Sequence, residues 1–413
     1  MSIIRIKLSF WAIELVKNPV VFLVIALMAG GLSLAWNVNG QFSDIRGFYG
    51  IHFLDGENDW PLAYHNVTSD TEAVHPVEYP SITALIIWIH SFLVQTNNEP
   101  WLQYFRITAV LNGILLVVAA QILAKQAGKK LAMLFLFSPA VMFSLNRNWD
   151  IWAIVSLAAC IYFFEKEKFK ISAAFLAISI STKFFPIFLL IPICIYLYRV
   201  NQKRIILTYL TWTASVYMAI NIPFAIINLE GWLYFYKFSF SRGLGSASIF
   251  EVLIQSGWIE SASEFAYYVL NITGILALIL TLVFSKKILK LSESSFAIFF
   301  VIMFFNKQYS MQYVIWLTFL AVLALSRIDR ATLRYPIYFF VCWQATEFMF
   351  QYVFFQNILT DIYAEITNDP IGQMRMSYAL TGVIRYTAIA LFLFVLMSGI
   401  ITRRKEALPQ QLA

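Results

Sequence analysis

Apolar segments long enough to cross a lipid bilayer recur along this chain from Val20 onward. A membrane helix needs about 20 apolar residues to cross roughly 30 Å of hydrocarbon. Hydrophobic residues make up 60% of the 413 residues and charged residues only 13%, whereas soluble globular domains are roughly 45–50% apolar. We therefore predict an all-α polytopic membrane protein, with residues 1–413 forming one integral membrane domain.

Basic residues are concentrated in short runs between the apolar segments, so membrane topology explains the net charge of +7 better than nucleic-acid binding does. The positive-inside rule assigns such runs to the cytoplasm, and an even number of crossings must join each run to the next. These rules predict about 12 transmembrane helices with both termini cytoplasmic, and the first apolar segment remains as an uncleaved anchor. The runs lie at residues 5–17, 125–130, 166–170, 199–204, 286–290, 327–334 and 403–405.

The first outer loop, residues 37–101, is long and acidic. It contains an apolar stretch at 81–94, which as a helix would be about 22 Å long at roughly 1.5 Å per residue. If this stretch crossed the membrane, the basic run at 125–130 would be outside, so we predict a helix lying along the membrane surface. A second large outer loop is predicted at residues 228–264.

Three predicted helical hairpins begin and end at basic runs and have polar residues at their apices. The apices are residues 146–150, 181–186 and 306–313, and they contain Arg147, Lys183 and Lys307. Charged groups and irregular backbone at membrane depth are costly and usually functional. We predict that the three apices line one pocket near the outer face. In the alternative interpretation, these cations are interfacial side chains that extend to water.

A cavity ringed by cations beneath an acidic loop fits a phosphate ester whose lipid tail stays in the bilayer. We expect Lys183, Lys307, Arg147 and Arg242 to neutralise a departing phosphate, because stabilisation of developing charge is commonly the largest catalytic contribution. Sugar transfer also needs a carboxylate that takes the proton from the acceptor hydroxyl. The acidic first loop supplies candidates for that base.

Four stretches of the chain form an ordered set of motifs. They are Phe-Ser-Asp-Ile-Arg-Gly-Phe-Tyr at 42–49, Val-Glu-Tyr-Pro-Ser-Ile-Thr-Ala-Leu at 77–85, Lys-Phe-Phe-Pro at 183–186, and Asn-Lys-Gln-Tyr-Ser-Met-Gln-Tyr at 306–313. This set resembles motifs of the polyprenyl-phosphate-dependent mannosyltransferases of the GT-C superfamily. The likeness is closest to glycosyltransferase family 87 and more distant to the GPI mannosyltransferase I group. It implies a GT-C-like fold in which juxtamembrane helices follow the first span.

This resemblance implies an inverting transfer of a hexose, most simply mannose, from a polyprenyl-phosphate sugar to a lipid or glycan acceptor, with Asp44 as the general base. The GPI group carries Asp-x-Asp where this chain has Asp44-Ile45-Arg46. We therefore predict no metal site, and we assign Arg46 to the donor phosphate. No cofactor is firmly implied, and a divalent-metal requirement is left open. Substrate binding is assigned to Glu78, Tyr79, Asp150, Gln308, Tyr309 and Gln312.

Several of these residues also have simpler interpretations. Asp44 would serve as the cap of a following helix, and Glu78 as a turn residue ahead of a proline. Asp150 is either a helix cap or a sugar-binding group. The four histidines lack metal-ligand spacing, and the acidic cluster in the first loop has the composition of a solvated turn; its members are Asp55, Glu57 and Asp59.

Two other functions compete with sugar transfer. A transporter or flippase for a lipid-linked or anionic glycan would also have many helices, but such proteins often contain inverted repeats, and we find no internal repeat. A non-catalytic assembly subunit would use the recessed cations for helix packing. The identity of the sugar stays open among mannose, arabinose, glucose and other hexoses. A bacterial inner membrane is favoured over the endoplasmic reticulum, with the active site on the extracytoplasmic side.

Overall fold

The computed structural model is almost entirely helical in the part of the chain that it describes. That part comprises residues 18–36, 40, 43–52, 65–66, 73–74, 76–95, 99–245, 247–261, 263–285, 288–329, 332–364 and 371–402. Two short antiparallel strands, β1 (His65–Asn66) and β2 (Ala73–Val74), pair within the first loop. The helices are α2 (Pro19–Trp36), α3 (Asp44–His52), α4 (Ser81–Ser91), α5 (Pro100–Ala127), α6 (Lys129–Leu136), α7 (Pro139–Ser144), α8 (Asp150–Glu165), α9 (Phe169–Thr182), the 3-10 helix η1 (Phe185–Leu189), α10 (Leu190–Arg199), α11 (Lys203–Ile227), α12 (Leu229–Ser241), α13 (Ile249–Gln255), α14 (Glu264–Phe284), α15 (Leu291–Phe304), α16 (Tyr313–Leu325), α17 (Arg334–Ala364) and α18 (Ile371–Thr402).

Four of the described helices contain a stretch long and apolar enough to cross a membrane unaided. These stretches are Pro100–Ala127 in α5, Lys203–Ile227 in α11, Phe265–Phe284 in α14 and Ser377–Ile400 in α18. Other apolar helices are shorter because the chain breaks between them. Pro139 begins α7 after Ser138, whose Oγ accepts a hydrogen bond from the Val141 N–H (3.3 Å), and Pro186 lies in η1 between α9 and α10. The total of about 12 spans therefore stays a prediction.

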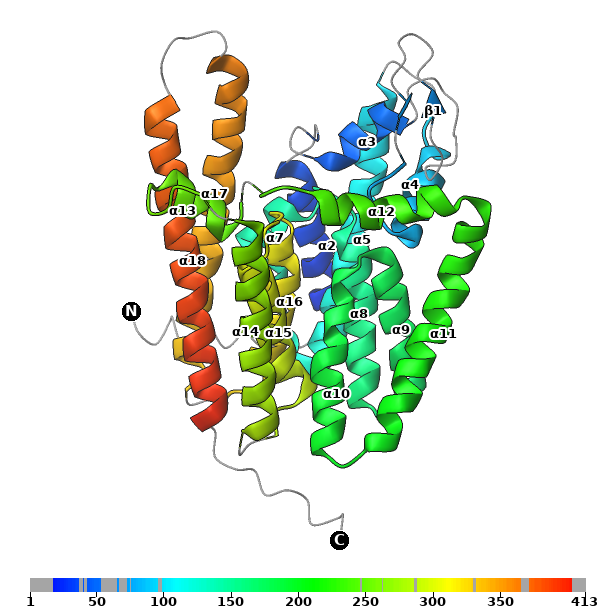
Figure 1. Cartoon of the computed structure of the whole chain (residues 1–413), viewed down its shortest axis with the longest axis vertical. Helices are drawn as coiled ribbons and strands as arrows, with labels where there is room; N and C mark the ends of the chain where they lie inside the picture. The colour runs from blue at the N-terminus through cyan, green and yellow to red at the C-terminus, as the bar shows by residue number, and fades with distance from the viewer. Residues whose placement is uncertain are drawn as a thin grey trace.

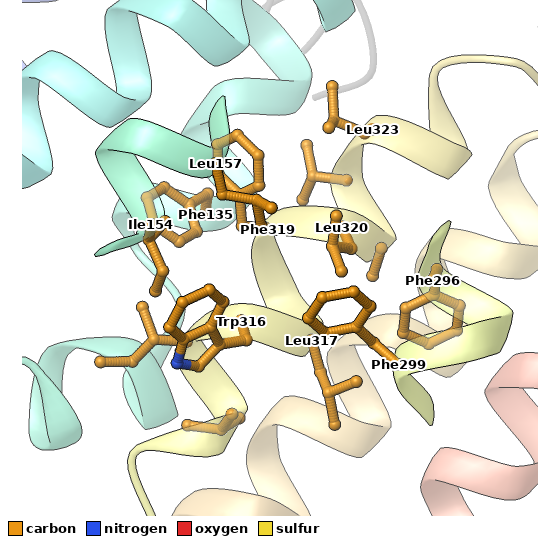
Figure 2. Close-up of a cluster of buried hydrophobic side chains, with 14 of the residues drawn as sticks. Phe135, Ile154, Leu157, Phe296, Phe299, Trp316, Leu317, Phe319, Leu320 and Leu323 are labelled. Carbon is orange, nitrogen blue, oxygen red and sulfur yellow. The ribbon is translucent and has the colours of Figure 1, made fainter. Parts of the chain in front are cut away.

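Helix α16 forms the centre of the bundle. Its sequence is apolar all round, and every one of its residues is buried. A helix without a polar face is stable only where apolar surroundings cover all its sides. Figure 2 shows Trp316, Phe319 and Leu320 of this helix surrounded by apolar side chains, Phe135 from α6 and Phe299 from α15 among them.

Helices α11 and α14 instead present large apolar side chains outward. Leu207 is 73% exposed, Ile226 78%, Phe265 77% and Phe284 77%. Contiguous exposed apolar surface of this kind indicates a membrane or protein interaction. Together with the lengths of the four spans, this exposed apolar surface indicates a multi-pass membrane protein.

One end of the bundle carries most of the irregular structure. In Figure 1, α12 runs across the upper part of the upright helices, and α3 and α4 lie toward the same end. Helix α4 ends at Ser91, short of the predicted 81–94, and it packs against α5, α9 and α11 with its polar side chains buried. Thr83 Oγ1 donates to the Thr182 carbonyl (2.5 Å), which joins the first loop to the end of α9.

Candidate active site

A cavity of about 680 Å³ opens at the end of the bundle where α3 and α12 lie. This volume falls within the roughly 300–1,000 Å³ typical of small-molecule sites. Its walls come from the first loop, from the hairpin apices at 181–186 and 306–313, and from α12, α14 and α15. Five charged side chains line it: Asp44, Glu78, Lys183, Arg242 and Lys307. Two of the three predicted apices and the first-loop carboxylates thus share one cavity.

The third apex, residues 146–150, positions Asp44 from behind. The Asp44 N–H donates to the Arg147 carbonyl (2.8 Å), and Ser43 Oγ donates to the Asn146 carbonyl (2.6 Å). Ser43 Oγ also accepts a hydrogen bond from the Ile45 N–H (3.2 Å) at the start of α3. The capping contact at this helix start therefore comes from Ser43, while the Asp44 carboxylate faces the cavity.

The electrostatic surroundings of Asp44 favour proton uptake. Its side chain is 40% exposed into the cavity, and its Oδ1 lies 3.9 Å from Arg147 Nη2. Burial raises the pKa of Asp44 above 3.8, and the positive charges of Arg147 and Lys183 partly oppose that rise. A carboxylate with a raised pKa binds a proton more readily, which suits a general base.

Lys183 lies on the cavity wall and is held by an ion pair. Helix α9 ends at Thr182, and Lys183 adopts an extended backbone (φ −147°, ψ 132°) that turns the chain toward η1. Its Nζ lies 2.7 Å from Asp150 Oδ1 and 4.6 Å from the centre of the Tyr79 ring. The ammonium is therefore fixed between a carboxylate and an aromatic face, both of which favour its charge.

Asp150 supports Lys183 from outside the cavity wall. It is 1% exposed and is absent from the cavity lining. Its Oδ2 accepts a hydrogen bond from Trp316 Nε1 in α16 (3.0 Å), and its N–H donates to Asn148 Oδ1 (3.0 Å). The side chain that accepts a hydrogen bond at the start of α8 is thus Asn148, and the Asp150 carboxylate orients Lys183.

Lys307 and Gln308 connect the apex at 306–313 to the loop after α12. Lys307 Nζ donates to the Phe240 carbonyl (3.0 Å), and the Gly245 N–H donates to the Lys307 carbonyl (2.7 Å). Gln308 Nε2 donates to the Gly243 carbonyl. A Cβ atom at Gly245 would lie 3.1 Å from Gln308 Cα, so this close approach of two backbones requires glycine. Lys307 and the loop that carries Arg242 are consequently held together.

The cavity lining also includes four of the residues to which the sequence analysis assigned substrate binding: Glu78, Tyr79, Gln308 and Gln312. Tyr309 does not line it: its ring lies 4.6 Å from the Arg385 guanidinium in the bundle interior. The backbone of this apex directs neighbouring side chains to opposite sides, so that Gln308 and Ser310 face the cavity while Tyr309 is buried.

Two predicted phosphate-binding arginines also lie outside the cavity lining. The Arg46 guanidinium stacks 3.7 Å from the centre of the Trp101 ring, where α5 begins. The Arg147 guanidinium approaches Asp44 and lies 4.3 Å from the centre of the Phe355 ring in α17. Both side chains are held by aromatic partners, and Arg147 acts on the cavity through Asp44.

An aromatic wall completes the cavity, and the sequence did not single it out. The predicted outer loop at 228–264 contains α12, whose Phe235, Tyr236, Phe238 and Phe240 line the cavity. Ile275 of α14 and Ile302 of α15 continue this apolar lining. The many aromatic residues of α12 were the sequence signal that could have indicated this wall. One cavity thus combines charged groups with an apolar surface.

Among the described residues, no group of three or more His, Cys, Asp or Glu side chains is arranged to hold a metal ion. The acidic cluster at Asp55, Glu57 and Asp59 lies outside the described residues.

Comparison with known proteins yields limited matches. No protein-family model matches the chain, and no curated protein matches it. Among solved structures, the chain is similar to ArnT from Cupriavidus metallidurans bound to undecaprenyl phosphate, with 15% identity and a TM-score of 0.45 over 92% of this chain and 77% of that one. It is similar to the apo state of the same protein with 14% identity and a TM-score of 0.45, over 96% of this chain and 78% of that one.

Proposed function

We propose that this protein is a GT-C-like glycosyltransferase that moves a hexose, in the first instance mannose, from a polyprenyl-phosphate donor to a lipid or glycan acceptor. One observation carries the proposal: Asp44, Lys183, Arg242 and Lys307 line one cavity that also has an extended aromatic and apolar wall. A lipid-linked phosphosugar needs this combination, because its head is anionic and its tail is hydrocarbon.

In the proposed reaction, an acceptor hydroxyl oxygen attacks the anomeric carbon of the donor sugar. The bond between that carbon and the phosphate oxygen breaks, and the polyprenyl phosphate leaves with the bonding electrons. Because the hydroxyl attacks from the face opposite the phosphate in a single displacement, the configuration inverts. Asp44 takes the proton from the acceptor hydroxyl. Lys183, Lys307 and Arg242 stabilise the negative charge that grows on the phosphate. Each of these groups faces the cavity.

The apolar side of the cavity suits the polyprenyl chain. Ile275 belongs to α14, a helix whose outward apolar side chains are exposed. Because the tail stays in the apolar bilayer, its bound position is stabilised by van der Waals packing against this wall and not by transfer out of water. We propose that the tail lies along this wall, while the sugar contacts polar side chains such as Glu78, Gln308 and Gln312.

The test is transfer of labelled mannose from a polyprenyl-phosphate donor by membranes that contain the protein. Asp44→Asn keeps the shape of the side chain but removes the base, so transfer should fall by at least a hundredfold, within the range typical of general bases. Asp329→Asn, an exposed carboxylate in the turn before α17, is the matched control and should transfer normally. Wild-type transfer rates in Asp44→Asn would refute this assignment of the base.

A transporter or flippase is the alternative function, and the same preparation distinguishes it. A flippase would move the intact donor across the bilayer of proteoliposomes and yield no new glycosidic bond. Appearance of a mannosylated product that depends on Asp44 excludes that alternative, whereas lipid movement without product supports it.

We also propose that the cavity faces away from the cytoplasm, in a bacterial inner membrane with both termini cytoplasmic. The basic runs that motivate this orientation include Lys166, Lys168 and Lys170. In a cysteine-free background, Glu57→Cys should react with a membrane-impermeant thiol reagent added from outside, and Lys168→Cys should not. The opposite labelling pattern would reverse the orientation.

A further inference from the structure

Two charged residues are buried inside the long helices α17 and α18, away from the cavity. Glu347 and Arg385 are each 1% exposed, and Arg385 Nη1 lies 3.5 Å from Glu347 Oε1. Arg385 falls within the apolar stretch of α18 that is long enough to cross the membrane. Ionisable groups at such positions are costly to bury and usually mark a functional element. The proposed chemistry uses neither residue.

Arg385 binds one carbonyl of the loop between α12 and α13. Its Nη2 donates to the Ala247 carbonyl (2.7 Å), and Tyr386 Oη donates to the same oxygen (2.8 Å). Two donors from α18 therefore converge on a single backbone acceptor, which fixes the loop at that point. A hydrogen bond from a charged donor is roughly twice as strong as a neutral one.

Arg385 also contacts the hairpin apex that carries Lys307. Its guanidinium lies 4.6 Å from the centre of the Tyr309 ring, and the Tyr386 ring lies 6.1 Å from the Tyr309 ring. Tyr309 is 5% exposed, so this contact lies in the interior. A cation over an aromatic face in a desolvated site is an attractive interaction. One side chain thus contacts two of the three segments that bear the cavity's cations, namely those with Arg242 and Lys307.

The two segments are joined again at the cavity itself. The Gly245 N–H donates to the Lys307 carbonyl, and Lys307 Nζ donates to the Phe240 carbonyl. Arg242 lies between Phe240 and Gly245 on the same loop. Displacement of Ala247 or Tyr309 would therefore shift Lys307 and Arg242, and a misplacement of about 1 Å in a reacting geometry costs on the order of a hundredfold.

We propose that Arg385, with its charge balanced by Glu347, is a positioning residue that holds Lys307 and Arg242 in place for the donor phosphate. This inference rests on the proposed function. Arg385 acts through the Ala247 carbonyl and the Tyr309 ring and does not touch the donor. Glu347 stabilises the guanidinium in the bundle interior, where an unpaired charge would destabilise the fold.

The experiment measures the affinity of the purified full chain in detergent for polyprenyl phosphate, a ligand that requires neither sugar nor turnover. Glu347→Gln combined with Arg385→Met removes both charges together and leaves no unpaired ion in the interior. Its dissociation constant for polyprenyl phosphate should rise at least tenfold. Tyr386→Phe removes one of the two hydrogen bonds to Ala247 with little change of shape, and its dissociation constant should rise about threefold, or roughly 0.65 kcal/mol.

Tyr209→Phe is the matched control for Tyr386→Phe. Tyr209 is 1% exposed, and its hydroxyl bonds to Ser172 Oγ (2.9 Å) among α8, α9 and α11, away from the cavity lining. It loses the same kind of hydrogen bond, so its ligand affinity should stay unchanged. Each variant is purified as a single folded species by size-exclusion chromatography before it is titrated with polyprenyl phosphate. The dissociation constant therefore does not depend on how much of the variant folds.

Each outcome bears on a distinct claim. If the double variant and Tyr386→Phe both bind polyprenyl phosphate with wild-type affinity, the positioning role is overturned and the proposed function stands. If the wild-type chain does not bind polyprenyl phosphate, the proposed function is overturned and the inference with it. Should the double variant fail to fold, Tyr386→Phe decides, and an unchanged dissociation constant in that variant refutes the proposal.

Discussion

The ion pair between Lys183 and Asp150 gives the sharpest quantitative prediction about the cavity. Asp150→Asn keeps the size of the side chain and its capacity to accept a hydrogen bond from Trp316 Nε1, but it removes the negative charge 2.7 Å from Lys183 Nζ. The change therefore isolates the charge interaction from packing. Its effect shows whether Asp150 orients Lys183 or is merely close to it.

The expected magnitude follows from the burial of the two side chains. Exposed ion pairs contribute about 0.2–1 kcal/mol, whereas removal of one partner from a fully buried pair costs about 3–5 kcal/mol. Asp150 is 1% exposed and Lys183 is 14% exposed toward the cavity. This pair lies between the two cases, so we expect a coupling energy of about 2 kcal/mol.

A double-mutant cycle measures this coupling. The free energy of unfolding in mixed detergent is determined for the wild type, Asp150→Asn, Lys183→Met and the double variant. A coupling below about 0.5 kcal/mol would mean that the pair behaves as an exposed one and would refute the reasoning. Asp150→Asn should also bind polyprenyl phosphate more weakly, because Lys183 loses the carboxylate that orients it toward the cavity. Unchanged or tighter binding would show that Asp150 does not position Lys183 for the ligand.

Two further predictions concern the base and the phosphate site. Burial raises the pKa of Asp44, and the positive charge of Arg147 partly opposes that rise. The value of kcat/KM for transfer should therefore fall as the pH drops through the raised pKa of Asp44. Arg147→Gln should move this acid limb to higher pH, and an unmoved limb would contradict the electrostatic coupling between Arg147 and Asp44. For the same reason, protonated Asp44 contributes stability that is present below its unfolded-state pKa and lost as the pH rises through its folded-state pKa. Lys307→Ala should raise the dissociation constant for polyprenyl phosphate about tenfold. The Arg46 guanidinium stacks on Trp101, so Arg46→Gln should change this constant less than about twofold. Similar losses of affinity in both variants would show that Arg46 belongs to the phosphate site.

Much of the architecture follows from local sequence patterns. The first apolar segment, which begins at Val20 and precedes the outer loop at residue 37, corresponds to α2 (Pro19–Trp36). Two of the polar apices coincide with the end of α9 at Thr182 and the start of α16 at Tyr313. These features depend on periodicity, proline and charge, which act over a few residues. The count of crossings exceeds the number of long helices described because several apolar helices are short. The chain breaks at Pro139, which begins α7, and at the apex that contains Pro186, between α9 and α10.

The candidate site was predictable in part. Asp44, Lys183, Lys307 and Arg242 share a cavity as expected, because basic runs and loop lengths already placed them at one end of the bundle. Their partners were not predictable, since contacts such as Asp150 to Trp316 join residues far apart in sequence.

The buried ion pair and the side-chain directions within the apex at 306–313 also depend on contacts that a single sequence does not reveal. Glu347 and Arg385 lie on different helices, and a single sequence carries no signal that they meet. Within the apex at 306–313, Gln308 faces the cavity and Tyr309 faces the interior, a distinction set by irregular backbone rather than by residue type.

The most direct measurement of the central claim is a cryo-EM structure of the full chain with polyprenyl phosphate bound. Our account predicts phosphate density in contact with Lys183 and Lys307, the Asp44 carboxylate across the space where the sugar would lie, and the hydrocarbon tail along Ile275 of α14. Phosphate density on another face of the protein, or a tail that leaves without touching α14, would contradict the shared cavity and the mechanism built on it.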